Sequence, residues 1–417
     1  MSPTIASRFC LTLMLAAVLP AVGAAAEEPA AAPVVGSVVL NKQNIFDLAD
    51  TKENNWLYRL VNRLHIVTRD DVIEQQLLFA PGDVYDRRLL EESERILRRN
   101  GYFFDASITP LPQADGTVDV EVKTKDVWSL TPDFSFTRNG GETRWAIGLE
   151  EENLLGLGQS IEVQRIEGID RDSNRFEFRD PNLGRSWTQL RLRFEDNSDG
   201  EVKLLSLVRP FPSLDSRWSA GVTAFDDDRR TALWRLGEEA AEFRQERRFL
   251  SAFGGWSRGL SRGWVRRYTA GVVFDDNAFS EQPAATLPPA VPTDRELVYP
   301  FVGFELLEDD FETSSNTNRM GRTEDFFLGT RVAGSLGWSD TGFGADRDAL
   351  IFSGTLSQGF GAIAGTALFL GAQLNGRHEG GRLANTTTAL SARFFHRQSP
   401  KWLFSALAVG LAGDNLD

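Results

Sequence analysis

From about Leu130 onward the chain is dominated by short runs in which apolar and charged side chains alternate, separated by turns rich in Gly, Asn and Asp. In one run Phe176 and Phe178 alternate with Arg175, Glu177 and Arg179. Because successive residues of a strand point to opposite sides, each run has one apolar face and one charged face. The pattern predicts many antiparallel strands in a sheet whose two faces meet different surroundings.

Two architectures satisfy this pattern, a soluble β-sandwich and a membrane β-barrel. The barrel is favoured because many charges lie on the second face, where a polar lumen tolerates them. Two connectors, Asp275 to Glu296 and Asp309 to Glu324, are long and polar in the manner of extracellular loops. Tryptophans also lie near expected strand ends, where a barrel has its interfacial girdles: Trp187, Trp218, Trp256, Trp264, Trp338 and Trp402. We therefore predict an antiparallel transmembrane β-barrel over residues 130–417.

The composition agrees with this prediction. A mean hydropathy of −0.26 is compatible with a barrel, because lipid-facing apolar and lumen-facing polar residues cancel in the average. Beyond the N-terminal segment no apolar stretch approaches the ~18 residues of a helical span. The net charge of −14 argues against a nucleic-acid partner, whose phosphates such a surface would repel.

The N-terminal segment, residues 1–26, is predicted to be a secretory signal peptide. It has one basic residue, Arg8, an apolar run from Phe9 to Ala21 that is too short to span a membrane, and small residues at Ala24 to Ala26. Residues 27–33, rich in Ala and Pro, are expected to form a leader. The only cysteine, Cys10, would leave with the signal peptide, so we expect no disulfide, zinc–cysteine site or cysteine nucleophile.

Residues 34–127 have the pattern of a compact αβ unit. We expect a strand near Val35 to Leu40 and a connector with helical spacing from Ile45 to His65. A first helix follows, with Thr68 as its cap and a buried stripe of Val72, Ile73 and Leu77. A second helix is capped by Asp86 and ended by a left-handed Gly101. A hairpin from Tyr102 to Thr109 and Thr117 to Lys123, turning at 114–116, completes the order β-α-α-β-β.

This unit resembles a POTRA domain, through the segment 68–78, the run Pro81-Gly82-Asp83-Val84-Tyr85-Asp86 and the segment 90–102. After it, Glu152 to Gln159 resembles the Asn-Leu-x-Gly-x-Gly segment near the start of barrels of the BamA and TamA kind. The residues that match are Asn153, Leu154, Gly156 and Gly158, and the Asp-Pro-Asn turn of those barrels is matched by Asp180, Pro181 and Asn182. The resemblance covers most of the chain and implies an α+β POTRA domain followed by an outer-membrane β-barrel.

The sequence departs from that superfamily in three respects. Alternation and turns indicate about twelve strands, whereas the resemblance implies about sixteen. The Arg-Gly-aromatic loop tip of the superfamily has only a superficial echo, out of place, at Arg262-Gly263-Trp264. The chain ends in the turn-like stretch 413–417 without a terminal aromatic residue. We therefore expect a barrel that is incomplete at its C-terminus, with strand edges left unpaired.

Function would then reside in strand edges rather than in catalytic groups. The candidate edge for binding an unfolded client by strand addition is Ala106, Ser107, Ile108 and Thr109, limited by Pro110; an edge that is merely exposed is the alternative. By resemblance, the first barrel strand would line the lateral seam where a client is released, through Thr131, Phe134, Phe136 and Arg138.

Catalytic and metal chemistry is not expected. His65, His378 and His396 lack ligand spacing and are expected on the surface or on strands, and the acidic clusters 226–228 and 309–310 fit solvated loop tips better than calcium sites. Gly-Leu-Gly at 156–158 fits a tight turn better than a nucleotide loop, because no helix is expected after it. The sequence thus indicates no enzyme, no cofactor and no metal.

The leading hypothesis is an outer-membrane insertase or translocase, with its POTRA domain in the periplasm and the membrane lipid around its barrel. The partners would be unfolded outer-membrane or secreted proteins and periplasmic accessory proteins. A passive channel or surface antigen without a client is the second hypothesis, and a soluble periplasmic protein is the third. Client crosslinking separates the first two, and recovery without detergent would indicate the third.

Overall fold

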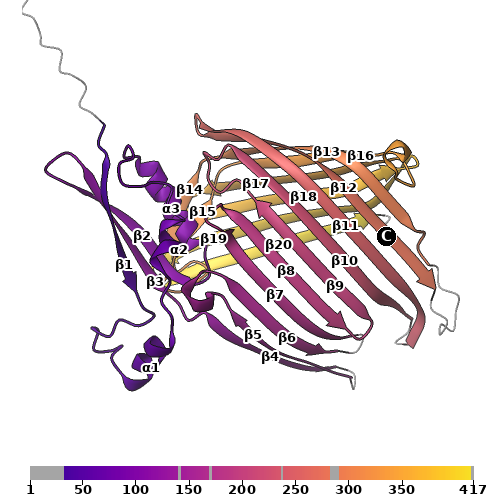
Figure 1. Cartoon of the computed structure of the whole chain (residues 1–417), viewed down its shortest axis with the longest axis horizontal. Coiled ribbons are helices and arrows are strands. Elements are labelled where there is room, and N and C mark those ends of the chain that lie inside the picture. Colours follow the sequence, from indigo (N-terminus) through magenta and orange to yellow (C-terminus); the bar gives the residue numbers. More distant parts are fainter. Residues whose placement is uncertain (1–31, 140–141, 169–170, 236–237, 282–290, 415–417) are drawn as a thin grey trace, which may run out of the picture.

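The computed structural model describes residues 32–139, 142–168, 171–235, 238–281 and 291–414. The expected signal peptide 1–26, with Cys10, lies outside the described residues, as do most of the expected leader 27–33 and the last residues 415–417. The chain has two units, an N-terminal αβ unit and a large curved antiparallel sheet that follows it (Figure 1).

The N-terminal unit has the predicted β-α-α-β-β order with one additional helix inserted after its first strand. Its elements are β1 (Val35–Gln43), α1 (Trp56–Leu64), α2 (Asp70–Glu74), α3 (Arg87–Arg98), β2 (Phe103–Pro112) and β3 (Val118–Asp126). The strand order is β1-β3-β2, with β3 parallel to β1 and antiparallel to β2. Both β1 and β2 are therefore edge strands of this sheet.

The core of this unit lies between the sheet and helices α2 and α3. The alternate residues Val118, Val120 and Val122 of β3 are buried, as the pattern predicts, and they pack with Ile73 and Leu97. Each such side chain contributes about 1.5–3 kcal/mol by leaving water. The other core members are Val35, Val72, Phe79, Leu90, Tyr102, Phe103, Ala106 and Ile108.

Local signals were read correctly at α3 and at the hairpin. The Asp86 carboxylate accepts a hydrogen bond from the Arg88 amide at 2.9 Å and caps α3. Gly116 has a φ of +85° in the turn between β2 and β3. The left-handed cap at Gly101 was wrong, because this residue does not adopt a positive φ. Instead, a Cβ at Gly101 would lie 2.6 Å from Glu152 Oε2, so the glycine permits a close approach to the second unit.

Two further expectations in this unit need correction. The helical spacing from Ile45 to His65 gives a helix only over Trp56–Leu64, capped by Asn55, whose side chain accepts from the Tyr58 amide at 3.0 Å. Thr68 does not cap α2, which begins at Asp70 after Arg69 without a side-chain cap. The Thr68 side chain is drawn instead into a buried contact with a distant strand, described below.

The second unit contains fifteen strands in one sheet and a separate two-stranded hairpin among the described residues. The sheet strands are β4 (Leu130–Asn139), β5 (Glu142–Glu151), β6 (Ser160–Glu167), β7 (Asp172–Leu183), β8 (Thr188–Asn197), β9 (Gly200–Arg209), β10 (Trp218–Arg235), β11 (Glu238–Ser261), β12 (Trp264–Glu281), β13 (Arg295–Glu308), β16 (Arg331–Ser339), β17 (Ala349–Gly361), β18 (Thr366–Glu379), β19 (Arg382–Ser399) and β20 (Trp402–Asp414). The hairpin is β14 (Phe311–Ser315) with β15 (Thr323–Phe327), and short 3-10 turns lie at η1 (Leu154–Gly156) and η2 (Thr341–Phe343).

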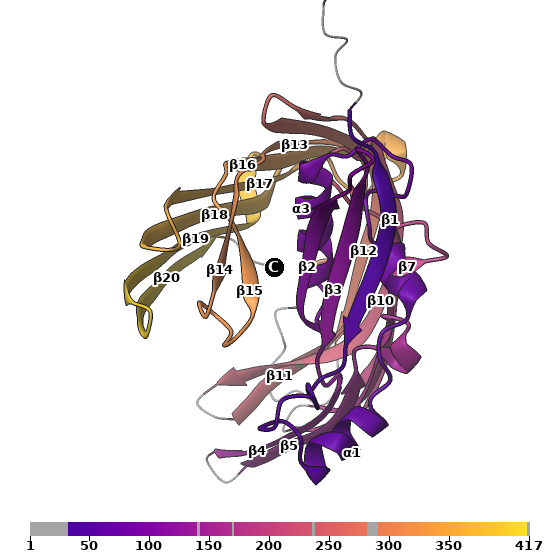
Figure 2. The same ribbon diagram turned by 90° about the vertical axis from the view of Figure 1, so that its left-hand side faces the viewer.

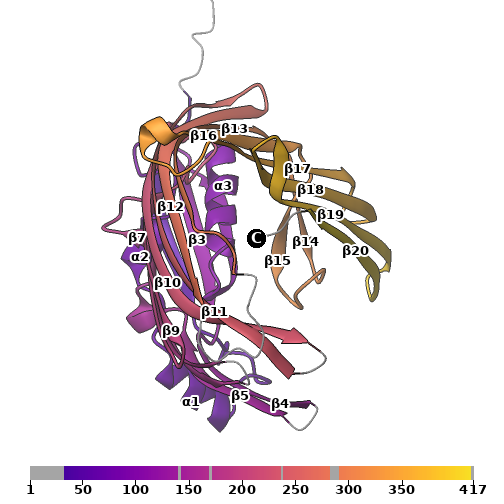
Figure 3. The same cartoon turned by 90° about the vertical axis from the view of Figure 1, so that its right-hand side faces the viewer.

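Each sheet strand pairs with its neighbours in chain order, except that β13 pairs with β16 past the hairpin. In the described part of the chain the sheet curves into an arc that does not close, with β4 and β20 as its edges (Figures 2 and 3). The estimate of about twelve strands was too low. The alternation from Phe326 to Trp338, for example, predicts one strand, whereas the two residues lie in β15 of the hairpin and β16 of the sheet.

The two faces of the sheet differ as the alternation predicts. Phe176 is 40% exposed, whereas its neighbour Glu177 is 3% exposed. Glu177 forms an ion pair with Arg191 at 2.7 Å across the neighbouring strand, on the inner side of the arc. Outward side chains are apolar and inward ones are charged and paired, which is the arrangement of a transmembrane barrel and the reverse of a soluble core.

The expected aromatic positions fit this arrangement in part. Trp218, Trp256, Trp338 and Trp402 are exposed, as interfacial residues would be. Trp187 and Trp264 are half-buried. Among the described residues no helix has the length and apolar character that crossing a membrane requires.

Candidate functional site

The two units meet at the loop that follows β5, which contains the Asn-Leu-x-Gly-x-Gly segment. Asn153 is buried there, and its Nδ2 donates to Thr68 Oγ1 of the N-terminal unit at 2.9 Å. Its Oδ1 accepts from the Gly158 amide at 2.8 Å. One amide side chain thus shapes its own loop and binds the preceding unit.

Thr68 also contacts Asp126, the last residue of β3. Its hydroxyl and its backbone amide both donate to Asp126 Oδ2, at 3.0 and 2.8 Å. His65 Nε2 lies 3.0 Å from the same oxygen, with its side chain buried. The expectation of a surface or strand position for His65 was therefore wrong. Sequence reasoning also missed Asp126, because its three contacts come from residues about sixty positions earlier.

The two glycines of the segment are required by the closeness of this contact. Gly156 and Gly158 have φ values of +73° and +69°. A Cβ at Gly156 would lie 2.7 Å from the Val67 carbonyl oxygen, and one at Gly158 would lie 2.9 Å from the Tyr102 hydroxyl. Both positions therefore favour glycine for conformation and for space. The turn expected at 156–158 is confirmed. The N-terminal unit packs against this turn, which we call the seat of that unit.

The Asp-Pro-Asn motif lies beside this seat and is tied to it. The Gln159 side-chain amide donates to Asp180 Oδ2 at 2.7 Å, and Asp180 Oδ1 accepts from the Asn182 amide at 2.9 Å. Asn182 Oδ1 in turn accepts from the Trp187 amide at 2.6 Å, while Pro181 is exposed. The two motifs matched by resemblance are therefore neighbours in space, and Gln159 connects them.

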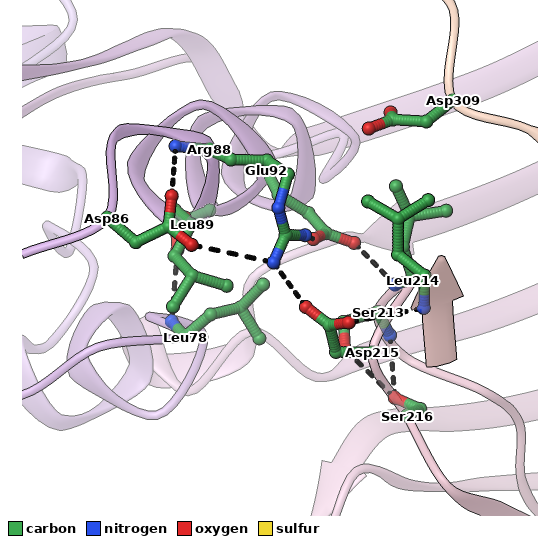
Figure 4. A network of polar contacts seen from close by, with 12 residues as sticks. Leu78, Asp86, Arg88, Leu89, Glu92, Ser213, Leu214, Asp215, Ser216 and Asp309 are labelled. Carbon is green, nitrogen blue, oxygen red and sulfur yellow. Dashed lines mark hydrogen bonds and ion pairs between the residues drawn. The ribbon is translucent and has the colours of Figure 1, made fainter. Parts of the chain in front are cut away.

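Helix α3 makes a second contact, with the turn between β9 and β10 (Figure 4). The Glu92 carboxylate accepts from the Leu214 amide at 2.6 Å, and Arg88 pairs with Asp215. Burial at this contact raises the pKa of Glu92 above its ordinary value, although the Leu214 amide, Arg95 and Arg88 oppose the shift. This contact holds α3 against the turn between β9 and β10.

The hairpin β14–β15 makes the third contact, inside the arc. Arg98 of α3 donates to the Asp325 carboxylate from Nε and Nη2, at 2.9 and 2.7 Å. On its other side the hairpin packs Phe326 against Phe369 and Phe395 of the sheet. The stretch Asp309 to Glu324 was expected to be an extracellular loop, but it lies at the end of the sheet that faces the N-terminal unit. Composition alone does not distinguish the two ends.

The candidate client edge, Ala106 to Thr109, lies on the edge strand β2. Arg98 Nη1 donates to the Ala106 carbonyl oxygen at 3.1 Å, and Glu94 accepts from the Ile108 amide at 3.0 Å. The side chains of Ala106 and Ile108 are buried, whereas Ser107 and Thr109 are exposed. Two side chains of α3 thus occupy backbone groups that a further strand would use.

The candidate seam residues Thr131, Phe134, Phe136 and Arg138 lie on β4, an edge strand of the large sheet. All four are exposed. In the part of the chain that the structure describes, β4 pairs with β5 alone. The client edge and the seam strand belong to different sheets.

No set of three or more His, Cys, Asp or Glu side chains among those described converges as metal ligands do.

The family model for the POTRA domain, described as a surface antigen variable number repeat, matches residues 64–125. The match begins at the end of α1 and omits β1, which pairs with β3 in the same sheet. A search of curated proteins finds no significant match to this sequence.

Several solved structures are similar at low identity. BamA from Haemophilus ducreyi lacking POTRA domains 1–3 is 12% identical with a TM-score of 0.36, over 91% of this chain and 72% of that one. CdiB from Acinetobacter baumannii is 9% identical with a TM-score of 0.42, over 90% of this chain and 63% of that one. CdiB from Escherichia coli is 11% identical with a TM-score of 0.29, over 94% and 91%. Likeness at this level says nothing about activity.

The family match and the observed order of the two units agree with each other. A three-stranded αβ unit that matches the POTRA model stands directly before an antiparallel sheet with an apolar outer face. Residues 64–125 are therefore a POTRA domain, and the chain continues from it into a large antiparallel sheet.

Proposed function

We propose that this protein assembles or translocates other proteins at the bacterial outer membrane, with its POTRA domain in the periplasm and its sheet in the lipid. Unfolded outer-membrane or secreted proteins are its clients, and periplasmic accessory proteins deliver them. The single observation that carries the proposal is the edge of β2, where side chains and not a neighbouring strand occupy the outward backbone groups. An extended client segment can take their place by strand addition.

Arg98 and Glu94 give this edge a defined resting state. Arg98 holds the Ala106 carbonyl while it binds Asp325 of the hairpin, so a client that displaces Arg98 also loosens the hairpin from α3. Glu94 holds the Ile108 amide and forms an ion pair with Arg98 at 3.3 Å. Binding of a client to β2 would therefore change the position of the hairpin inside the arc.

The exit in this proposal is the edge of β4. Its outward backbone groups can pair with a client strand, while Phe134 and Phe136 keep the client's neighbouring side chains in an apolar environment. The chain does this work by exchanging hydrogen bonds between strands, and no catalytic residue is assigned.

The test is photocrosslinking to nascent outer-membrane proteins in cells. The photoreactive residue belongs at Thr109, whose side chain is exposed, because Ile108 faces the core. The matched control is Val39, exposed on β1 at the opposite edge of the same sheet. We expect client adducts at Thr109 and none at Val39.

A second variant sharpens the result. Glu94→Ala frees the Ile108 amide and should raise the adduct yield at Thr109 several-fold, because the client no longer competes with the carboxylate. Adducts at Val39 alone would move client binding to the other edge. Absence of any adduct, together with steady ion conductance in planar bilayers, would favour the passive channel.

A further inference from the structure

Helix α1 presents an apolar surface that the protein itself does not cover. Trp56 is 72% exposed and Leu64 is 64% exposed, and Leu57 and Leu60 between them are also exposed. At 100° per residue these four side chains share one face of the helix, about 100° wide. None of the nine residues of α1 is buried.

The opposite face of α1 is the one that docks. Tyr58 stacks on Phe46 with ring centroids 3.9 Å apart. The Asn62 side chain donates to the Phe46 carbonyl at 2.8 Å and accepts from its amide at 3.1 Å. The helix is therefore oriented by its polar and aromatic side, which holds the apolar face outward.

The position of α1 places this face next to the lipid-facing surface of the sheet. In Figures 1 and 2 the helix lies beside β4 and β5, at the end of the sheet that faces the POTRA domain. Just after α1, exposed Ile66 lies against the 153–158 loop, since a Cβ at Gly156 would be 3.4 Å from Ile66 Cγ2. Leu155 in that loop is exposed. Beyond it the outward Leu149 of β5 and its partner Val163 of β6 continue the apolar surface.

The flank of the apolar face carries positive charge. Arg59 and Arg63 are exposed, and at 100° per residue they lie beside Trp56 on the helix. An apolar face with a tryptophan and flanking arginines is the composition of a helix that lies in a membrane interface, where the arginines reach lipid phosphates. A protein partner would not require continuity with the lipid-facing strands.

From this geometry we propose that α1 is an interfacial anchor that lies in the periplasmic leaflet of the outer membrane, beside the edge strand β4, and binds phospholipid through Trp56, Leu57, Leu60 and Leu64. The inference rests on the membrane location of the sheet proposed above. By holding the chain between β1 and α2 at the lipid surface, α1 fixes how the POTRA domain is tilted over the arc and keeps it next to the seam strand.

The test measures lipid contact in the full chain reconstituted into phospholipid vesicles. An environment-sensitive fluorophore is attached to Leu60→Cys in a chain that also carries Cys10→Ser, and brominated phospholipid is the quencher. Leu149→Cys, on the lipid-facing surface of β5, is the positive control. Ala114→Cys is the negative control, exposed in the turn at the end of β2 and β3 that is opposite to the junction.

We expect strong quenching at Leu149, at least about half as much at Leu60, and none at Ala114. Arg59→Gln with Arg63→Gln should lower the quenching at Leu60 about twofold or more in vesicles that contain phosphatidylglycerol, because the charge attraction is lost. Quenching at Leu149 with none at Leu60 would overturn the anchor and leave the membrane location intact. Absence of quenching at both sites would overturn the membrane location and the anchor together.

Discussion

The POTRA domain and the large sheet treat the same kinds of side chain in opposite ways. In the POTRA domain Leu97 and Ile73 are fully buried, and charged residues such as Arg87 are exposed. In the sheet Leu336 is exposed, and Glu177 and Glu195 are buried. One chain therefore follows two rules of burial, one on each side of residue 130.

The surroundings of each unit, and not its residue types, therefore decide whether the apolar or the charged face of a strand turns inward. In water the apolar side chains gather because their exposure costs free energy. A lipid surface would remove that cost from the outer face, while the strands gain from backbone pairing with their neighbours and from charges that meet on the inner face. The ion pairs of Glu177 with Arg191 and of Glu195 with Arg175, at 2.7 and 2.6 Å, satisfy those inner charges.

The largest expected effect contrasts a buried leucine with an outward-facing one. Leu97→Ala should lower the free energy of unfolding of the POTRA domain by about 2–5 kcal/mol, because it leaves a cavity in the core. Leu336→Ala in the sheet leaves no internal cavity and should change stability far less. Urea titration of the full chain in detergent, followed by proteolysis of each unit, measures both. Equal losses would mean that the outer face of the sheet is packed against protein.

Charge substitution inverts this contrast. In lipid vesicles Leu336→Arg should destabilise the sheet by about 2–4 kcal/mol, because it places a cation in hydrocarbon. The control is Val39→Arg on the exposed face of β1, where a surface substitution should stay within about 0.5 kcal/mol. Unfolding of the vesicle-bound chain by denaturant is the measurement. A tolerated arginine at position 336 would contradict the membrane assignment of that face.

The next prediction concerns the junction between the POTRA domain and the sheet, where Asn153 is buried. Asn153→Ala should cost about 1–3 kcal/mol, because the Gly158 amide and the Thr68 hydroxyl each lose a buried partner. Hydrogen exchange of the 153–159 amides should rise in the variant. Pro181→Ala, at an exposed position of the neighbouring motif, is the control and should leave exchange unchanged. Unaltered exchange in Asn153→Ala would show that the junction does not depend on this side chain.

The smallest expected effect concerns pH at the contact of α3 with the β9–β10 turn. Because burial raises the pKa of Glu92, the carboxyl stabilises the folded state most at pH below its ordinary range, and this stabilisation is lost as pH rises through the raised pKa. Glu92→Gln stays neutral, so the wild type should become less stable relative to this variant as pH rises from 4.5 to 8. Urea unfolding at the two pH values measures the difference. The opposite trend would mean that Arg88 and Arg95 outweigh burial.

Sequence reasoning succeeded where the signal lies within a few neighbouring residues. The Asp86 cap and the turn at Gly116 each depend on residues within one helical turn or one hairpin. The alternation of Phe176 with Glu177 sufficed to predict the two faces of the sheet. Both motifs could be recognised in the sequence. Their closeness in space, with Asn153 and Asp180 at the junction of the two units, could not be predicted from it.

The failures share a cause as well. Thr68 is a residue type that often caps a helix. Its hydroxyl instead donates a hydrogen bond to Asp126, 58 residues away, because a buried carboxylate is the stronger partner. The polar stretch 309–324 resembles an exposed loop, yet its continuation at Asp325 pairs with Arg98, 227 residues away. Alternation and turn counting indicated about twelve strands, whereas the sheet has fifteen among the described residues.

Local sequence patterns were enough to predict the two units, their order, the inner and outer faces of the strands and the β-α-α-β-β order of the POTRA domain. These follow from periodicity and capping, which are local forces between residues close in the chain. Three features could be seen only in the folded chain. One is the junction at which His65, Thr68, Asp126 and Asn153 meet. The others are the position of the hairpin β14–β15 inside the arc and the contact of α3 with the edge of β2. Such contacts depend on where distant segments arrive, and no local pattern encodes that.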